Sequence, residues 1–249
     1  MIKRFIKAIS KSHLIPEKII NTIRFNSLRK KYNLRAYEND QNLKFDQLGL
    51  DREKGIFNLN QLKKQNPVLI RAMSSEHETL FSSISLLKKK EHLNILEIGT
   101  HDGINSYLLS LLFENSKIKT IDLESKDYEF QNSYNREKNY INFIIQRDEV
   151  IKERKNIFFK EQNSLSLINT NEKYDLIWVD GSHGYPTVCI DIINSLKLIN
   201  NNGLILCDDV FTNKPKNQDG TYSSIATFET ISALKKEKLI NFHLVYKRL

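Results

Sequence analysis

The stretch that decides the fold is Asn94–Ser106, with the sequence NILEIGTHDGINS. It joins a short apolar run, residues 95–98, to a turn that contains Gly99 and Gly103. Apolar residues at helical spacing follow the turn, which predicts that a helix begins there. A buried strand that leads through a glycine turn into a helix is typical of the first unit of a nucleotide-binding α/β fold.

A second stretch, Tyr174–Tyr185, has the sequence YDLIWVDGSHGY and repeats the pattern of a buried strand followed by a glycine. It places Asp180, His183 and Tyr185 at or just beyond the end of the strand. Ligands of open α/β sheets bind at the carboxyl ends of the strands. We therefore expect these two stretches to form the functional site.

Short apolar runs recur along the rest of the chain and alternate with helical patterns. The predicted strands are Leu93–Ile98, Ile118–Asp122, Ile157–Phe159, Tyr174–Asp180, Leu204–Cys207 and Phe242–Tyr246. This alternation predicts an α/β fold with a doubly wound, mostly parallel sheet and helices on both faces.

The connections add detail to this architecture. Ser75 and Glu78 fit a capping box at the start of a helix that leads into the first strand. Residues 124–155 are longer than a crossover needs, so part of them is expected to be an insertion that either covers a substrate or extends the helix. Residues 36–72 are polar with scattered apolar positions and predict a loop-rich connector with short helices.

Basic residues are concentrated at the N-terminus. The formal net charge is +8, yet residues 1–35 hold ten Lys and Arg residues and a single acidic residue, while residues 36–249 hold 28 basic and 29 acidic ones. This distribution removes the support for nucleic-acid binding by the whole protein. We therefore divide the chain into a basic helical extension with its connector, residues 1–72, and a domain, residues 73–249.

Apolar residues in residues 1–31 recur at helical spacing among the basic ones. The segment is either a reversible anchor on an anionic membrane surface or a pair of helices packed on the domain or on a second subunit. Cys189 and Cys207 lie in apolar segments, which favours reduced thiols and a cytoplasmic location. The sequence contains no run of about 18 apolar residues, so no membrane-spanning helix is predicted.

The glycine turn by itself is compatible with two cofactors. Asp122 follows Gly99 by 23 residues, where an acidic residue meets ribose hydroxyls in dinucleotide-binding folds. The dinucleotide motif G-x-G-x-x-G is absent, because His101 occupies the position of the middle glycine. Glu97 would repel a pyrophosphate and suits a cationic ligand better.

On these residues the chain resembles the class I S-adenosylmethionine (SAM)-dependent methyltransferases, over about residues 73–246. Glu97-Ile98-Gly99-x-x-x-Gly103 is similar to the first motif of that family, and Asp122 to the acid that ends its second strand. The resemblance implies a Rossmann-like fold and SAM as cofactor. The implied cofactor-binding residues are Met73, Glu97, Gly99, Gly103, Asn105, Ser106, Asp122, Asn163, Ser164 and Asp180.

The second half of the chain resembles the metal-dependent O-methyltransferases, in particular the macrocin-type sugar O-methyltransferases. Asp180-Gly181-Ser182-His183 and Asp208-Asp209 carry this resemblance. It implies a divalent metal, Mg²⁺ or another cation, held by Asp180, Asp208 and Asp209. Carboxylates suit Mg²⁺, a metal lowers the pKa of a bound hydroxyl, and His183 can take the proton as general base.

Each of these residues also has a purely structural alternative. Asp180 could cap the following segment, Asp208-Asp209 could be a solvated turn, and His183 could make structural hydrogen bonds. His101 is interpreted as supporting the glycine turn rather than as catalytic, and Tyr185 as packing, with contact to a substrate as the alternative. His77 is interpreted as lying on the first turn of a helix with no further role.

The resulting hypothesis is an O-methyltransferase that acts on a hydroxyl of a small molecule, with a sugar or glycoconjugate as the expected acceptor. The sugar rests on the resemblance alone. Two rivals remain: a SAM-binding partner subunit without turnover, and an NAD-dependent oxidoreductase, which the missing glycine disfavours.

Overall fold

The computed structural model describes residues 34–70, 76–89, 91–133, 139–213 and 224–246. The chain divides into two compact units, Met1–Gly49 and Leu50–Leu249. In the described part of the first unit, helix α3 spans Leu34–Gln47. The basic segment of residues 1–31 lies outside the described residues, so the anchor and packing alternatives stay predictions.

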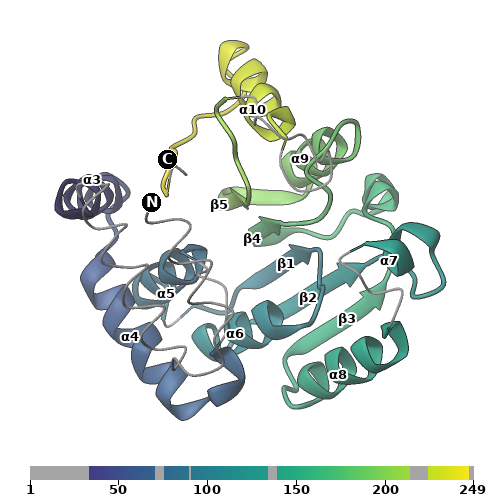
Figure 1. The fold of residues 1–249 in the computed structure, drawn as a ribbon. Coiled ribbons are helices and arrows are strands. Elements are labelled where there is room, and N and C mark those ends of the chain that lie inside the picture. Colours follow the sequence, from purple (N-terminus) through teal and green to yellow (C-terminus); the bar gives the residue numbers. More distant parts are fainter. Residues whose placement is uncertain (1–33, 71–75, 90, 134–138, 214–223, 247–249) are drawn as a thin grey trace, which may run out of the picture. The chain divides into compact units, whose positions relative to one another are not determined.

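The second unit contains a five-stranded parallel sheet (Figure 1). The spatial order of the strands is β3-β2-β1-β4-β5. Their bounds are β1 Asn94–Ile98, β2 Lys117–Asp122, β3 Ile157–Glu161, β4 Tyr174–Val179 and β5 Ile199–Cys207. The predicted Rossmann-like class of fold is confirmed.

Strand β1 is the centre of the sheet, and Ile95 pairs with Ile118 on β2 and with Leu176 on β4. Residues 95–98 are all buried, because helices cover both faces of the sheet at this position. The chain winds outward from β1 through β2 to β3 and then returns to the other side of β1 as β4. This reversal between β1 and β4 is the point at which open α/β sheets bind ligands.

Helices lie on both faces of the sheet, as Figure 1 shows. One layer contains α5 (His77–Leu87), α6 (Ile104–Leu112) and α8 (Tyr140–Lys152), with α6 in contact with the other two. The opposite layer contains the 3₁₀ helix η3 (Ser164–Asn169), α9 (Thr187–Leu198) and α10 (Ala226–Lys236), with α9 in contact with the other two.

The connector is more helical than predicted. Residues 36–72 contain most of α3, the 14-residue helix α4 (Arg52–Gln65) and the 3₁₀ helix η1 (Pro67–Leu69). Helix α4 packs on α5 through Gly55, where an added Cβ would lie 2.0 Å from Ser83 Oγ. Helix α4 packs through this close backbone approach and lacks a broad apolar stripe. The sequence pattern therefore did not predict a long helix here.

The predicted last strand is wrong. Residues 242–246 are described and contain no strand. Phe242 instead packs against the cluster of Val188, Ile192, Ala226 and Ile231 between α9 and α10. Phe242 is therefore used for helix packing rather than for pairing beside β5.

The long second crossover contains an additional short helix. Helix α7 (Tyr128–Asn132) precedes the crossover helix α8, and residues 134–138 between them lie outside the described part. Phe130 of α7 is buried and its ring lies 6.2 Å from that of Phe143 on α8. Helix α7 is therefore packed into the domain, and a role in covering a substrate stays a prediction.

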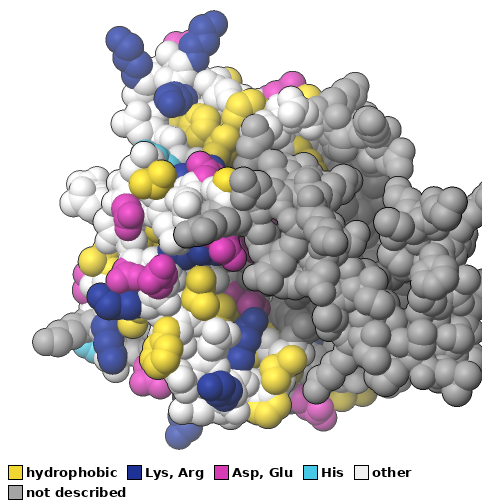
Figure 2. All heavy atoms as spheres, turned by 60° about the vertical axis from the view of Figure 1, so that its left-hand side comes forward, with side chains coloured by type: hydrophobic (Ala, Val, Ile, Leu, Met, Phe, Trp, Pro, Cys, Tyr) yellow, Lys and Arg dark blue, Asp and Glu magenta, His cyan; other side chains and the backbone are white. Residues whose placement is uncertain are grey.

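The surface of the described residues is mixed in charge. On the face drawn in Figure 2, basic and acidic side chains are interspersed among hydrophobic ones. None of the described helices combines the length and the hydropathy that crossing a membrane requires.

Candidate active site

The glycine turn after β1 brings the two quoted stretches together. Gly99 has φ +103°, and a Cβ there would lie 2.1 Å from the carbonyl oxygen of Asp180. Gly103 has φ +75° and precedes the first residue of α6. Only glycine combines this backbone conformation with so close an approach. The turn and the end of β4 therefore form one surface at the carboxyl edge of the sheet.

Backbone hydrogen bonds hold the neighbouring strand ends in line. The N–H of Asp180 donates to the carbonyl of Ile98 at 2.9 Å, and the N–H of Asp208 donates to the carbonyl of Val179 at 3.1 Å. The acidic residues that follow β4 and β5 are thus placed at the same edge as the glycine turn.

Glu97 is fully buried beneath this turn. Its carboxylate accepts hydrogen bonds from Asn105 Nδ2 at 2.7 Å, from Thr120 Oγ1 at 2.6 Å and from Ser106 Oγ. The side chains of Asn105 and Ser106 thus bind Glu97, and all three side chains are buried. Their predicted contact with a cofactor stays a prediction, while the structure gives them a clear role in holding β1, β2 and α6 together.

Asp122 supports the same turn from β2. Its Oδ2 accepts from the backbone N–H of His101 at 2.9 Å, and its Oδ1 accepts from that of Leu123 at 2.8 Å. His101 has φ +49°, so the carboxylate stabilises a backbone conformation that is uncommon for residues other than glycine. A carboxylate has about four acceptor positions, which leaves capacity for the ribose hydroxyls predicted to bind there.

Asn163 and Ser164 follow β3 at the same edge. Asn163 caps η3, and its side chain accepts from the N–H of Leu165 at 2.9 Å. The carbonyl of Ser164 accepts from Asn194 Nδ2 of α9 at 3.3 Å. The predicted adenine contact of this pair is untested, and Met73 lies outside the described residues.

His183 lies between two of the acidic residues. Its Nε2 is 3.7 Å from Asp180 Oδ1 and 3.9 Å from Asp209 Oδ2, and 4% of its side chain is exposed. These separations slightly exceed hydrogen-bond length. The predicted grouping of Asp180, His183 and Asp209 is therefore present.

Burial and the neighbouring carboxylates both raise the pKa of Asp180. Removal from water raises it well above the ordinary value, and repulsion from Asp208, Glu97 and Asp209 raises it further. The indole N–H of Trp178, which lies 3.3 Å from Asp180 Oδ2, opposes the rise. A cationic ligand at this edge would relieve the repulsion between these groups.

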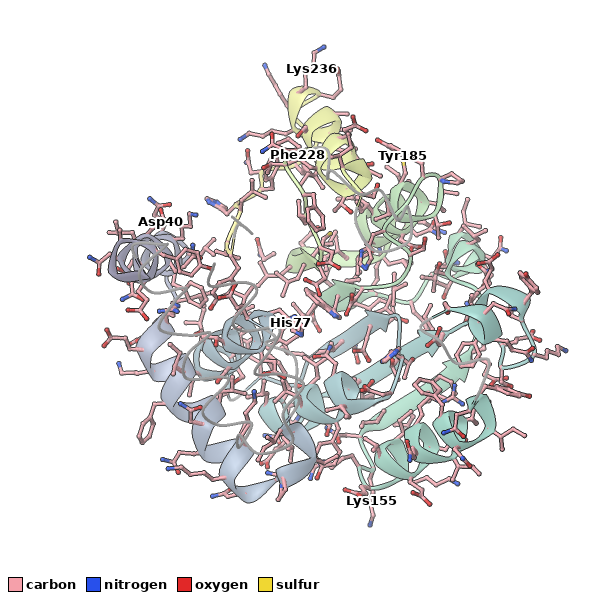
Figure 3. The ribbon with its side chains drawn as sticks, in the orientation of Figure 1. Asp40, His77, Lys155, Tyr185, Phe228 and Lys236 are labelled. Atoms are coloured by element: carbon pink, nitrogen blue, oxygen red, sulfur yellow. The ribbon has the colours of Figure 1, made fainter. Side chains whose placement is uncertain are left out.

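His77 is a site residue that the sequence interpretation missed. It is the first residue of α5, and its Nδ1 lies 3.6 Å from Asp208 Oδ2. In Figure 3 it lies between α5 and the strands β4 and β5. No spacing in the sequence relates residue 77 to residue 208, so the pair arises from the packing of α5 beside β4.

His101 and Tyr185 lie at the margins of this group. The His101 ring lies 5.2 Å from that of Phe143, and its Nδ1 is 3.8 Å from Asp102 Oδ2. Tyr185 is 56% exposed. These positions agree with the interpretation that His101 supports the turn. The exposure of Tyr185 does not match the packing role, and its alternative role as a substrate contact stays a prediction.

Asp191 of α9 is a further buried acid, directly behind the loop that follows β4. It has no exposed surface, and neither carboxylate oxygen accepts a hydrogen bond within the described part of the chain. Burial raises its pKa to about 6. The sequence interpretation passed over this residue, because it occupies an ordinary position within a helix.

A family model described as "Methyltransferase domain" matches residues 96–210. The matched segment includes the glycine turn, Asp122, the Asp180–His183 loop and Asp208-Asp209. This match supports the methyltransferase class that the motifs predict. No curated protein matches the chain.

Solved structures resemble the fold at low sequence identity. The methyltransferase PaMTH1 from Podospora anserina, in its SAH-bound form, is 19% identical with a TM-score of 0.47, covering 74% of this chain and 79% of that chain. The O-methyltransferase TomG from Streptomyces achromogenes, in complex with SAM, is 17% identical with a TM-score of 0.45. The match covers 79% of this chain and 82% of that chain. These likenesses do not identify an acceptor.

Replacing Gly99 should disrupt the junction between the two stretches. Gly99→Ala places a methyl group against the Asp180 carbonyl and imposes an unfavourable φ, so the free energy of unfolding should fall by about 3 kcal/mol or more. Gly181→Ala is the matched control, because its Cβ would meet its nearest neighbour at 3.5 Å. Urea denaturation of both variants checks this, and equal stabilities would contradict the proposed junction.

Neutralising Asp191 should stabilise the protein only above about pH 4. Its folded-state pKa of about 6 exceeds the ordinary value of 3.8 for an aspartate, so the folded state binds the proton more tightly than the unfolded state. The resulting destabilisation is absent below pH 4, grows up to pH 6 and is complete above it, at about 3 kcal/mol. Asp191→Asn should therefore raise the unfolding free energy at pH 8 and leave it nearly unchanged at pH 4.

Thermal unfolding across this pH range measures the effect. Glu237→Gln, which removes an exposed carboxylate at the end of α10, is the control and should show no such pH dependence. The same pH dependence of stability in both variants would show that the pKa of Asp191 is not raised in the folded protein.

Proposed function

We propose that the chain transfers a methyl group from SAM to a hydroxyl of a small molecule. The single observation that carries the proposal is the convergence of the glycine turn with Asp180 and His183 at the switch point of a domain that matches a methyltransferase model. This convergence would place a cofactor site beside a proton acceptor.

The cofactor side of the proposal rests on the turn between β1 and α6. Gly99 and Gly103 keep the backbone clear of side chains, and Asp122 presents a fixed carboxylate beside them. The acidic edge formed by Asp180, Asp208 and Asp209 suits a ligand with a positive charge. In this proposal the turn lies under the methionine part of SAM and Asp122 binds the ribose.

The chemistry requires removal of one proton. SAM supplies an electrophilic methyl group on a positively charged sulfur and leaves as S-adenosylhomocysteine. In this proposal His183 takes the proton of the acceptor hydroxyl, and the oxygen forms the new bond to the methyl carbon as the carbon–sulfur bond breaks. The carboxylates of Asp180 and Asp209 stabilise the imidazolium that results.

The metal that the resemblance implied fits the described residues poorly. Asp180, Asp208 and Asp209 have the right donor atoms, but within the described ranges no three His, Cys, Asp or Glu side chains are arranged to hold a metal ion. The proposed mechanism therefore contains no step through a metal, and Mg²⁺ stays a prediction from the resemblance.

The acceptor and the two rival functions remain to be separated. A sugar or glycoconjugate is proposed on the resemblance to macrocin-type enzymes alone. A partner subunit without turnover would share the fold and bind SAM. An NAD-dependent oxidoreductase is less favoured, because the non-glycine residue His101 stands where a pyrophosphate-binding turn requires glycine.

Calorimetry should detect binding of both SAM and S-adenosylhomocysteine in the micromolar range. The expectation follows from the glycine turn and Asp122, and Asp122→Asn should weaken both by about tenfold because a charge-assisted hydrogen bond to the ribose is lost. Half-buried Asp127, the cap of α7, provides the control variant Asp127→Asn. Binding heat with NAD, but with neither SAM nor S-adenosylhomocysteine, would reject the proposal.

His183→Ala should lower methyl transfer by about 100-fold or more, because a positioned general base contributes at least that much. Release of S-adenosylhomocysteine is measured with a free hexose, a nucleoside diphosphate hexose and a catechol as acceptors. Affinity for SAM should be retained. Turnover by His183→Ala at the wild-type rate would exclude His183 as the base.

The same assay in EDTA tests the metal separately. Loss of transfer that added Mg²⁺ restores would support the metal requirement, whereas full transfer in EDTA would remove the metal and leave the role of His183 intact. Binding of SAM without transfer to any acceptor would favour the partner-subunit alternative.

A further inference from the structure

Trp178 is the only tryptophan of the chain, and it lies next to the acidic edge of the site. It belongs to β4 and precedes Asp180 by two residues. Side chains two residues apart in a strand point to the same face of a sheet, so the indole and the carboxylate lie on one side. The proposed function gives Trp178 no role, and its contacts therefore need an explanation of their own.

The two oxygens of the Asp180 carboxylate have different neighbours. The indole N–H of Trp178 donates a hydrogen bond to Oδ2 at 3.3 Å. The other oxygen, Oδ1, lies 3.7 Å from His183 Nε2. Because 29% of the Asp180 side chain is exposed, the carboxylate is held from one side and still reaches the surface of the site. One oxygen is thus engaged by the indole, while the other faces the imidazole.

The backbone of Asp180 is fixed by the neighbouring strand. Its N–H donates to the carbonyl of Ile98 at 2.9 Å, and its own carbonyl lies against Gly99, where a Cβ would approach to 2.1 Å. The freedom that remains to Asp180 is rotation about its side-chain bonds. A donor at Oδ2 restricts that rotation, so the indole determines the direction in which Oδ1 points.

The indole itself is held by aromatic packing against α5. Trp178 is buried, its ring meets that of Phe81 edge to face with 4.9 Å between centroids, and the His77 ring lies 5.0 Å from it. Edge-to-face contacts of this kind are favourable beyond the area that they bury. The donor therefore has a fixed position before any ligand binds, and a fixed donor costs no reorganisation at the moment of reaction.

We propose that Trp178 is a positioning residue of this site, whose indole N–H holds Asp180 Oδ2 so that Asp180 Oδ1 faces His183. The inference rests on the proposed methyl transfer, in which Asp180 stabilises the imidazolium of His183. Trp178 takes no part in the transfer of the proton or of the methyl group. It acts through Asp180, because it fixes where the carboxylate oxygen lies relative to the base.

The rival explanation is that Trp178 only fills the space between β4 and α5. Benzothienylalanine, introduced at position 178 by amber suppression, separates the two roles because it has the shape of tryptophan with sulfur in place of the N–H. It should lower kcat about tenfold and leave the affinity for S-adenosylhomocysteine within about twofold, since only the orientation of Asp180 is lost. Trp178→Phe should show the same loss of kcat together with lower stability, because the smaller ring leaves a cavity.

Tyr174→Phe is the matched control. Tyr174 is a buried aromatic residue at the opposite end of β4, and its hydroxyl donates to the carboxylate of Glu172. The substitution removes a donor to a carboxylate from the same strand but away from the site, so kcat should stay at the wild-type value. The acceptor is the one that gives the highest release of S-adenosylhomocysteine with the wild-type chain.

Two kinetic outcomes would overturn the proposal. Wild-type kcat with benzothienylalanine at position 178 would show that the N–H is not needed and that Trp178 only packs. Equal losses of kcat and of affinity for S-adenosylhomocysteine would show that Trp178 acts on cofactor binding and not on the orientation of Asp180 toward His183.

Heteronuclear NMR tests the hydrogen bond without turnover. Because the chain contains a single tryptophan, its spectrum has one indole N–H cross-peak. Asp180→Ala removes the acceptor, so the proton resonance should move upfield, toward that of a free indole. Asp175→Ala is the control, because Asp175 is an acid at the start of β4 that accepts from the N–H of Asn94 and should leave the cross-peak in place.

The two experiments separate the inference from the function on which it rests. An unmoved cross-peak in Asp180→Ala would overturn the hydrogen bond, and with it the positioning role, even if methyl transfer is confirmed. Absence of binding of SAM and S-adenosylhomocysteine by the wild-type chain would reject the proposed function, while the cross-peak would still report the contact between Trp178 and Asp180.

Discussion

The buried carboxylate of Glu97 is the interaction on which the site depends. Side chains from α6 and β2 donate to it, so one charged group joins the central strand, its neighbour and the helix that follows the glycine turn. Loss of one such donor typically costs about 1.5–3 kcal/mol, the usual range for a hydrogen bond to a charged group. The geometry of the turn is therefore coupled to the stability of the sheet, and a change at residue 97 would act on both.

A second constraint joins the cofactor side of the site to its chemical side. Gly99 lies against the backbone of Asp180, and hydrogen bonds between strand ends continue the line to Asp208. Because all five strands are parallel, every strand end that carries an acid reaches the same edge. This convergence brings like charges together, and their repulsion adds to burial in raising the pKa of Asp180. Imidazoles from two different elements lie within 4 Å of these acids.

The centre of the sheet could be predicted because β1 and β4 are buried on both faces and read as nearly continuous apolar runs. The runs at Ile95–Ile98 and Leu176–Val179 have this form, and both strands are present. Helix α4 escaped prediction because it docks through Gly55 and not through an apolar stripe. The run at Phe242–Tyr246 is equally apolar, but Phe242 fills a cluster between two helices. Local patterns report that a residue will be buried, and they do not report what it will be buried against.

The sequence by itself determined the class of fold, the glycine turn and the acids after β2, β4 and β5, since strand order and periodicity are local properties of the chain. Only the tertiary structure decided how these residues are used. It directed Asn105 and Ser106 toward Glu97, because the first turn of α6 packs over the buried strand end. It also brought His77 to Asp208, because α5 packs beside β4 and its first residue meets the end of β5. Contacts between residues so distant in the chain depend on packing, which no motif or spacing encodes.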